Sequence, residues 1–381
     1  MEAERYDRQQ RIDGWNQSAL SAARVIVAGA GALGNEVIKN LALMGVGHIL
    51  IIDFDRIELS NLSRTALFRE KDVGRAKAEV AAERAALLNS EIKVRYVDGD
   101  LSSDIGLGFY RHAELVIGAL DNLAARAEVG LSCSLAATPF LDGGMWAWGG
   151  EARWFMGGAG ICFACTLSDA ERSYASERRS CTGFRRAEDD EGARRVATTI
   201  STSALVGGLL AQEAARYLCG WEIAWGEAIV YNGLKLSLHR STLTRSVECP
   251  YHEPYANVRE LPARASSTTA KEVLAMAGQE SSEACTLELG RDFVLSLRCS
   301  LCGEREEVNA LLSRMDESSS ACPRCQRARQ PETTSSIGPD HAMAARRLSE
   351  LGIPPGEVLA VRALEELLLY ELTGDVTALW R

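Results

Sequence analysis

Two pairs of cysteines in the C-terminal third of the chain have the spacing of a metal site. Cys299 and Cys302 form one C-x-x-C pair, Cys322 and Cys325 form the other, and 19 residues lie between the pairs. This spacing is typical of zinc ribbons, in which four thiolates hold Zn²⁺ tetrahedrally. Because four thiolates leave no open coordination position, we predict a structural zinc site rather than a catalytic one.

A glycine-rich segment indicates where a nucleotide binds. Gly29, Gly31 and Gly34 form a G-x-G-x-x-G pattern between an apolar run and a stretch with helical periodicity. Such glycines permit a tight turn and a close approach of the backbone to phosphate or ribose. Asp53 ends the next apolar run, where its carboxylate can accept hydrogen bonds from ribose hydroxyls. Taken alone, the pattern is most typical of NAD- or FAD-dependent enzymes.

Charged motifs around this segment change that interpretation. In chain order they are Arg5-Tyr6-Asp7-Arg8-Gln9, Asp53-Phe54-Asp55, Asn61-Leu62-Ser63-Arg64, Val73-Gly74 with Lys77, and Asp121-Asn122. In this order and spacing, the motifs resemble those of the ThiF/MoeB/ubiquitin-activating-enzyme family, in which they build an adenylation site. The resemblance covers residues 5–255 and is specific, because these five motifs and the glycine pattern, six in all, agree in order.

The resemblance implies a role for each of these side chains around ATP and Mg²⁺. Asp53 and Asp55 would hold the ribose, Asn61, Arg64 and Lys77 would contact phosphates, Asp121 beside Asn122 would hold Mg²⁺, and Arg8 would reach the phosphates across a homodimer interface. Attack of a carboxylate on the α-phosphate brings two anions together, so cations must neutralise the developing charge. Taken singly, each of these charged residues is more typical of a solvated surface.

A further cysteine pair indicates a second metal site. Cys162 and Cys165 form a C-x-x-C pair, which supplies half of a zinc shell. In the family the other half is a second C-x-x-C pair near the end of the domain, and the corresponding residues here are Cys249 and His252. The resemblance therefore implies a shell of three cysteines and one histidine, which suits Zn²⁺. The histidine departs from the family pattern, and a plain surface role for His252 is the alternative.

Cys181 lies in a cationic stretch of sequence. Four nearby arginines favour its thiolate form, and these are Arg178, Arg179, Arg185 and Arg186. The pair Cys181-Thr182 also resembles the catalytic cysteine of ubiquitin-type activating enzymes, which accepts the activated carrier as a thioester. We interpret Cys181 as a nucleophile. The alternative is an incidental loop cysteine, because sulfur-carrier activators do not uniformly require one.

The alternation of short apolar runs with helical patterns predicts the elements that position these residues. We expect strands at residues 24–28, 48–52, 93–97, 115–118 and 139–141, and helices at 33–44, 77–88 and 199–218. Such β-α-β alternation calls for a mostly parallel sheet flanked by helices, so the predicted fold class is α/β and Rossmann-like, with a C-terminal zinc ribbon. We divide the chain into an adenylation domain at 1–260 with a crossover loop at 168–195, a linker and lead-in to the ribbon at 261–295, the ribbon at 296–330, and a tail of unknown role at 331–381.

The composition bounds the class of protein. A hydrophobic fraction of 46% and a charged fraction of 25% are those of an ordinary soluble globular protein. The net charge of −10 argues against general nucleic-acid binding, which requires a basic surface. The charged N-terminus and the lack of a run of about 18 apolar residues predict a cytoplasmic protein with no membrane span.

The leading hypothesis is an activating enzyme that adenylates the C-terminal glycine of a ubiquitin-like protein. The enzyme would then carry the protein as a thioester on Cys181 and pass it to a conjugating enzyme. The closest alternative is adenylation of a sulfur carrier, ThiS- or MoaD-like, for thiamin or molybdopterin synthesis. A nicotinamide- or flavin-dependent oxidoreductase is the alternative of another class, and a nucleotide-binding scaffold without turnover is a further one.

Overall fold

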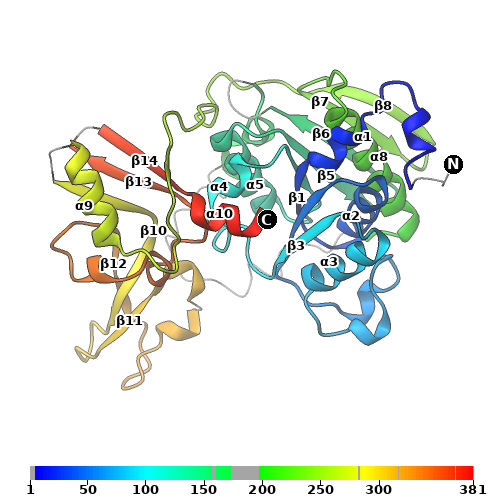
Figure 1. The fold of residues 1–381 in the computed structure, drawn as a ribbon. Helices are drawn as coiled ribbons and strands as arrows, with labels where there is room; N and C mark the ends of the chain where they lie inside the picture. Colours follow the sequence, from blue (N-terminus) through cyan, green and yellow to red (C-terminus); the bar gives the residue numbers. More distant parts are fainter. Residues whose placement is uncertain are drawn as a thin grey trace.

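The computed structural model describes residues 5–156, 160–172, 197–281, 284–315, 317–364 and 366–380. These residues form two β-sheets with helices packed against them (Figure 1). The larger sheet has the strand order β3-β2-β1-β4-β5-β6-β7-β8. The smaller sheet has the order β11-β10-β13-β14-β9, and β12 pairs with β10 outside that path.

The larger sheet begins with five parallel strands and ends with three antiparallel ones. The strands are β1 (Arg24–Ala28), β2 (His48–Ile52), β3 (Lys93–Val97), β4 (Leu115–Gly118), β5 (Phe140–Trp146), β6 (Gly149–Phe155), β7 (Glu227–Asn232) and β8 (Ser237–Thr242). The predicted α/β fold with a mostly parallel sheet is therefore confirmed. Strand β5 is longer than predicted, because Gly143 and Gly144 interrupt its apolar run yet still pair with β6.

Helices cover both faces of this sheet (Figure 1). Val25 and Val27 pack on one side of the sheet. The helices on that side are α1 (Gln17–Ala22), α2 (Ala32–Met44), α3 (Lys77–Leu88) and α8 (Ile200–Leu218). Ile26 and Ala28 pack on the opposite side, against α4 (Leu107–Arg111) and α5 (Leu123–Ala136). Because both faces are buried, β1 has to be apolar at successive positions, as its sequence shows.

The smaller sheet forms around a core of its own. Its elements are β9 (Arg259–Leu261), α9 (Ala270–Ser281), β10 (Cys285–Arg298), β11 (Arg305–Leu311), β12 (Gln330–Ile337), β13 (Val358–Ala363), β14 (Glu366–Leu372) and α10 (Thr373–Trp380). Helix α9 packs Val273 and Leu274 into a cluster with residues of β10, β13 and β14. The C-terminal cysteine pairs lie just after β10 and just before β12.

Regular elements fill both the expected linker and lead-in at 261–295 and the expected tail at 331–381. The first range contains α9 and most of β10, and the second contains most of β12 together with β13, β14 and α10. The polar residues that suggested a linker include Thr269. This threonine instead forms a capping box with Glu272 at the start of α9. In β10 the register shifts between Glu288 and Phe293, so the alternation that would reveal a strand is broken. A domain boundary near residue 260 stays a prediction.

The smaller sheet is attached to the α4 side of the larger one. Val358 and Val376 share a hydrophobic cluster with Ile26 of β1. The backbone N–H of Gly108 donates to the carbonyl of Gly356 at 2.8 Å. These contacts join the two sheets into one body. Within the described ranges, none of the helices is long and apolar enough to cross a membrane.

Candidate active site and metal centres

The glycine turn between β1 and α2 leaves an open space beside the start of a helix. Gly29 has φ +96°, and a Cβ there would lie 2.6 Å from the carbonyl oxygen of Ala119. A Cβ on Gly34 would lie 2.0 Å from the carbonyl oxygen of Gly29. In contrast, a Cβ on Gly31 would meet no atom within 4 Å. Gly31 is the N-cap of α2, so the open space faces backbone N–H groups that favour an anion.

Asp53 is bound to this turn. One carboxylate oxygen accepts the N–H of Ala30 at 2.7 Å, and the other accepts the N–H of Asp55 at 2.8 Å. Burial raises the pKa of Asp53 above its usual value, although the charge of Lys77 acts in the opposite direction. Each oxygen keeps a second lone pair, so the carboxylate can still accept bonds from ribose hydroxyls.

Lys77 and Asp55 form an ion pair next to Asp53. The ammonium of Lys77 lies 2.6 Å from Oδ2 of Asp55, and the backbone N–H of Lys77 donates to the carbonyl of Asp55 at 2.9 Å. Only 13% of the Lys77 side chain is exposed, whereas 52% of the Asp55 side chain is exposed. The lysine is thus held in place at the start of α3 and retains further N–H donors for a ligand.

Asn61 and Arg64 lie on the segment between β2 and α3. Asn61 is buried and closes a 3-10 turn, with its side-chain oxygen accepting the N–H of Glu58 at 3.0 Å. The guanidinium of Arg64 donates to the carbonyl of Ser60 at 2.7 Å. These contacts hold Asn61 and Arg64 within the segment, and the structure assigns neither of them a bond to Asp53 or Lys77.

Asn35 joins this segment to the glycine turn, a role the sequence analysis missed. Its amide nitrogen donates to the carbonyl of Ala30 at 2.7 Å, and its oxygen accepts the N–H of Leu67 at 2.9 Å. Asn35 is fully buried. The signal was a polar amide inside an apolar helical pattern, directly after the third glycine.

The segment after β4 returns beside the glycine turn. The N–H of Ala119 donates to the carbonyl of Ala28 at 2.8 Å, so the chain leaves the sheet next to Gly29. Asp121 follows and is exposed. Asn122 caps α5, with its side-chain oxygen accepting the N–H of Ala125 at 2.8 Å. The structure therefore places Asp121 at the same edge of the sheet as Asp53 and gives Asn122 a helix-capping contact.

Arg8 lies away from these residues within one chain. The neighbouring Gln9 donates to the carbonyl of Met44 at 2.9 Å, at the end of α2 opposite to Gly31. A helix of 13 residues is about 20 Å long, which exceeds the reach of an arginine side chain. Cys181 and its four neighbouring arginines fall outside the described residues.

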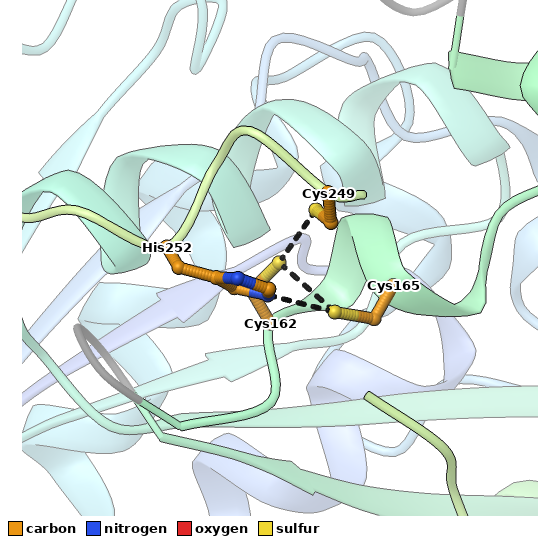
Figure 2. Close-up of side chains that lie close together, drawn as sticks. All are labelled: Cys162, Cys165, Cys249 and His252. Carbon is orange, nitrogen blue, oxygen red and sulfur yellow. Dashed lines mark hydrogen bonds between the residues drawn. The ribbon is translucent and has the colours of Figure 1, made fainter. Parts of the chain in front are cut away.

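The structure brings together the first predicted set of metal ligands (Figure 2). Sγ of Cys162 lies 3.7 Å from Sγ of Cys165 and 3.6 Å from Sγ of Cys249, and Nε2 of His252 lies 2.9 Å from Sγ of Cys165. Tetrahedral zinc with bonds of about 2.3 Å separates its sulfur ligands by about 3.8 Å, so both of these sulfur–sulfur distances fit zinc. Burial and the charge of Arg245 lower the pKa of His252, which favours the neutral imidazole that ligates metals.

The C-terminal cysteine pairs also converge. Sγ of Cys299 lies 3.5 Å from Sγ of Cys325, and Sγ of Cys302 lies 3.6 Å from Sγ of Cys322. Disulfide sulfurs are about 2.05 Å apart, so these spacings match ligands around one ion rather than disulfides. The N–H of Cys302 lowers the pKa of Cys299 to about 6, which favours a thiolate at neutral pH. The cluster is consistent with the predicted zinc ribbon.

Comparison with known proteins gives the family and several relatives. The ThiF family is matched over residues 6–251. The chain is 31% identical over 269 residues to the "Sulfur carrier protein adenylyltransferase" of Thermus thermophilus, covering 68% of this chain and 94% of that protein. It is 36% identical over 157 residues to the "SUMO-activating enzyme subunit 2" of Dictyostelium discoideum, covering 41% of this chain and 24% of that protein. A third relative, the "NEDD8-activating enzyme E1 catalytic subunit" of the same organism, is 40% identical over 165 residues, covering 38% and 35%.

Solved structures agree with the fold. The structure of E. coli MccB with AMPCPP and MccA superposes with a TM-score of 0.53 at 22% identity, covering 66% of this chain and 74% of that chain. At this identity the likeness concerns the fold. The chain spans only about a quarter and about a third of the two Dictyostelium relatives, but nearly the whole Thermus protein. From the match over residues 6–251 and the Thermus relative, this chain belongs to the ThiF family.

Proposed function

We propose that this chain uses ATP to adenylate the C-terminal glycine carboxylate of a small ubiquitin-like carrier protein. The observation that carries the proposal is the convergence of Asp53, the open backbone at Gly31 and the ion-paired Lys77 at one edge of the sheet. The Thermus relative, named a sulfur carrier protein adenylyltransferase, supports it. Family membership likewise favours adenylation over a nicotinamide- or flavin-dependent reaction.

In this proposal the residues of the site bind and orient the triphosphate. Asp53 accepts bonds from the ribose, and the N-terminus of α2 at Gly31 faces the phosphates. Lys77 exchanges part of its contact with Asp55 for the phosphates, and Arg64 adds a second positive charge. The exposed carboxylate of Asp121 suits Mg²⁺, which when bound would neutralise charge on the triphosphate.

The chemistry requires positioning rather than a covalent group on the protein. A carboxylate oxygen of the carrier attacks the α-phosphorus and forms an O–P bond. The bond from that phosphorus to the bridging oxygen breaks, and pyrophosphate leaves with the electron pair. Cations at the sheet edge lower the cost of bringing the anionic carboxylate to the anionic phosphate.

A homodimer would complete the site with Arg8. Within one chain, Arg8 lies at the far end of α2 from Gly31. A second copy is therefore required if this arginine is to contact the phosphates, as the family resemblance implies.

Zinc in the two cysteine clusters would support the structure, because each cluster offers four ligands to one ion.

The fate of the adenylate divides the proposal into two branches. In the first, the thiolate of Cys181 attacks the acyl carbon, a C–S bond forms and AMP leaves, after which the carrier passes to a conjugating enzyme. In the second, the carrier is a sulfur carrier, and a sulfide-level sulfur donor attacks the acyl carbon of the adenylate, so that a C–S bond forms, AMP leaves and a thiocarboxylate results without a required thioester on Cys181. This second branch is supported by the alignment with the Thermus sulfur carrier protein adenylyltransferase, which covers 94% of that protein.

Exchange of labelled pyrophosphate into ATP tests the common step. We expect exchange that depends on a carrier, assayed with purified ubiquitin-like proteins ending in Gly-Gly, including SUMO, NEDD8 and a bacterial sulfur carrier. A protein that binds ATP but shows no exchange with any of them would contradict the proposal. The variant Cys181→Ala then separates the branches, because loss of a reducible carrier adduct with retained exchange supports the thioester.

A further inference from the structure

A buried ion cluster lies beside the candidate active site and takes no part in the functions described above. Asp142 of β5 is fully buried and contacts two arginines. Arg126 of α5 donates from Nε to Oδ1 at 2.9 Å and from Nη2 to Oδ2 at 2.5 Å. Arg153 of β6 donates to Oδ2 from Nε at 3.0 Å and from Nη2 at 2.7 Å. Arg126 therefore makes a bidentate contact with both carboxylate oxygens of Asp142, whereas both hydrogen bonds of Arg153 go to Oδ2.

The cluster is closed on one side by an aromatic ring. The guanidinium carbons of Arg126 and Arg153 lie 5.6 Å and 5.1 Å from the ring centre of Phe163, at distances typical of cation–π contacts. Glu151 is the second acid, 3.3 Å from Nε of Arg153. Burial alone would raise the pKa of Asp142, but the two arginines outweigh it and lower that pKa, so the carboxylate stays ionised. The two arginines and the two carboxylates of the cluster therefore balance each other's charge.

The cluster is connected to the magnesium-binding residue of the proposed site by one turn of helix. The N–H of Arg126 donates to the carbonyl of Asn122 at 3.2 Å, so Arg126 belongs to the first turn of α5. Asp121 immediately precedes that turn. On the sheet, Asp142 pairs in register with Gly118, the last residue of β4. Asp142 and Arg126 therefore span the short segment 119–122 from both of its ends.

We infer that Asp142 is a positioning residue, which through Arg126 fixes the first turn of α5 and so holds Asp121 at the magnesium site. The inference rests on the proposed function, because it assigns Asp121 to Mg²⁺. The bidentate contact fixes both the distance and the orientation of Arg126 relative to the sheet. A lysine at the same position keeps the charge but has no rigid fork, so the turn would be held less firmly.

The matched pair Arg126→Lys and Arg153→Lys tests this assignment. Both variants keep the charge and replace a guanidinium on the same carboxylate and the same aromatic ring. Only Arg126 belongs to the helix that begins beside Asp121. Calorimetric titration of the full chain with ATP, in Mg²⁺ and in EDTA, measures how much Mg²⁺ strengthens binding, and it needs no carrier protein.

We expect Arg126→Lys to weaken binding of Mg-ATP by about 10-fold and to leave Mg-free ATP binding nearly unchanged, as for a residue that orients a metal ligand. Arg153→Lys should retain Mg-ATP affinity. Its thermal stability should fall by about as much as that of Arg126→Lys, because both variants lose a guanidinium contact to Asp142. Equal losses of Mg-ATP affinity in the two variants would overturn the inference, since they would show a general structural effect.

A double-mutant cycle with Asp121→Asn provides an independent readout. If Arg126 acts through Asp121, then Arg126→Lys combined with Asp121→Asn loses no more Mg-ATP affinity than Asp121→Asn alone. Additive losses would contradict the positioning role. Wild-type protein that binds Mg-ATP but exchanges no pyrophosphate would refute the proposed adenylation and leave this test intact.

Discussion

Lys77 and Asp55 are joined twice, through an ammonium–carboxylate contact of 2.6 Å and a backbone hydrogen bond of 2.9 Å. The two residues are separated by 22 positions in the chain. The double contact sets the start of α3 against the carboxyl end of β2, so the lysine faces the edge where Asp53 lies. A cation fixed before the ligand arrives needs little reorganisation during the reaction.

Replacement of Lys77 should therefore abolish most of the activity with little effect on the fold. We expect Lys77→Met to reduce carrier-dependent pyrophosphate exchange by about 100-fold, the typical effect of losing one preorganised charge contact. Lys71→Met is the control, because Lys71 is an exposed lysine on the same connecting segment. Exchange by Lys77→Met at the wild-type rate would contradict the phosphate-binding role.

Mixing of inactive variants distinguishes an Arg8 supplied by a second copy from an Arg8 with no role. In a homodimer with Arg8 acting across the interface, a dimer of one Arg8→Ala chain and one Lys77→Met chain contains one intact site. Random mixing of the two inactive variants should restore about one quarter of the wild-type exchange rate. If Arg8→Ala is fully active by itself, or if mixing restores nothing, the trans role is wrong.

The two metal clusters should each bind one zinc ion. We expect about two zinc ions per chain by elemental analysis, because each cluster presents four ligand atoms that all lie within 4.8 Å of one another. His252→Ala should lower the content toward one, whereas His252→Cys should keep two. Cys219→Ser, outside both clusters, is the control and should keep two as well. Unchanged zinc content in His252→Ala would show that this histidine is not a ligand.

The contact between the two sheets should be sensitive to acid. Burial alone would raise the pKa of Glu371, but hydrogen bonds from His112 at 2.6 Å and Arg111 at 2.8 Å outweigh it and lower that pKa. A carboxyl whose pKa is lowered by folding contributes stability above its unfolded pKa, near 4.5, and loses it as the pH falls through the folded value.

Chemical unfolding at a series of pH values measures this contribution. Glu371→Gln should lower the free energy of unfolding at pH 7 by about 3 kcal/mol, because two partners lose a buried charge. The difference between wild type and variant should shrink as the pH falls below about 4.5. Glu350→Gln, at an exposed glutamate of the same part of the chain, is the control. A difference that stays constant down to acid pH would show that Glu371 does not carry the effect.

The sequence by itself determined the first four strands, the glycine turn and the four C-terminal cysteines as one set of metal ligands, whereas only the resemblance to a family paired Cys162 and Cys165 with Cys249 and His252. These features depend on short-range patterns, since apolar runs of strand length, G-x-G-x-x-G and C-x-x-C spacing each lie within a few residues. The resemblance to a family then assigned Asp53, Lys77 and Asp121 to one site. The structure places all three at the same edge of the sheet. Cys181 is a prediction that the described residues do not reach.

Only the tertiary structure decided which distant side chains meet. Asp142 contacts Arg126 and Arg153 because β5, β6 and α5 pack together, and no local pattern encodes that pairing. Likewise, β10 is a strand because three neighbours supply its hydrogen bonds despite an irregular sequence. The distance from Arg8 to Gly31 is set by the length of α2. Long-range pairing and burial settle such contacts, whereas periodicity and spacing report only what neighbouring residues share.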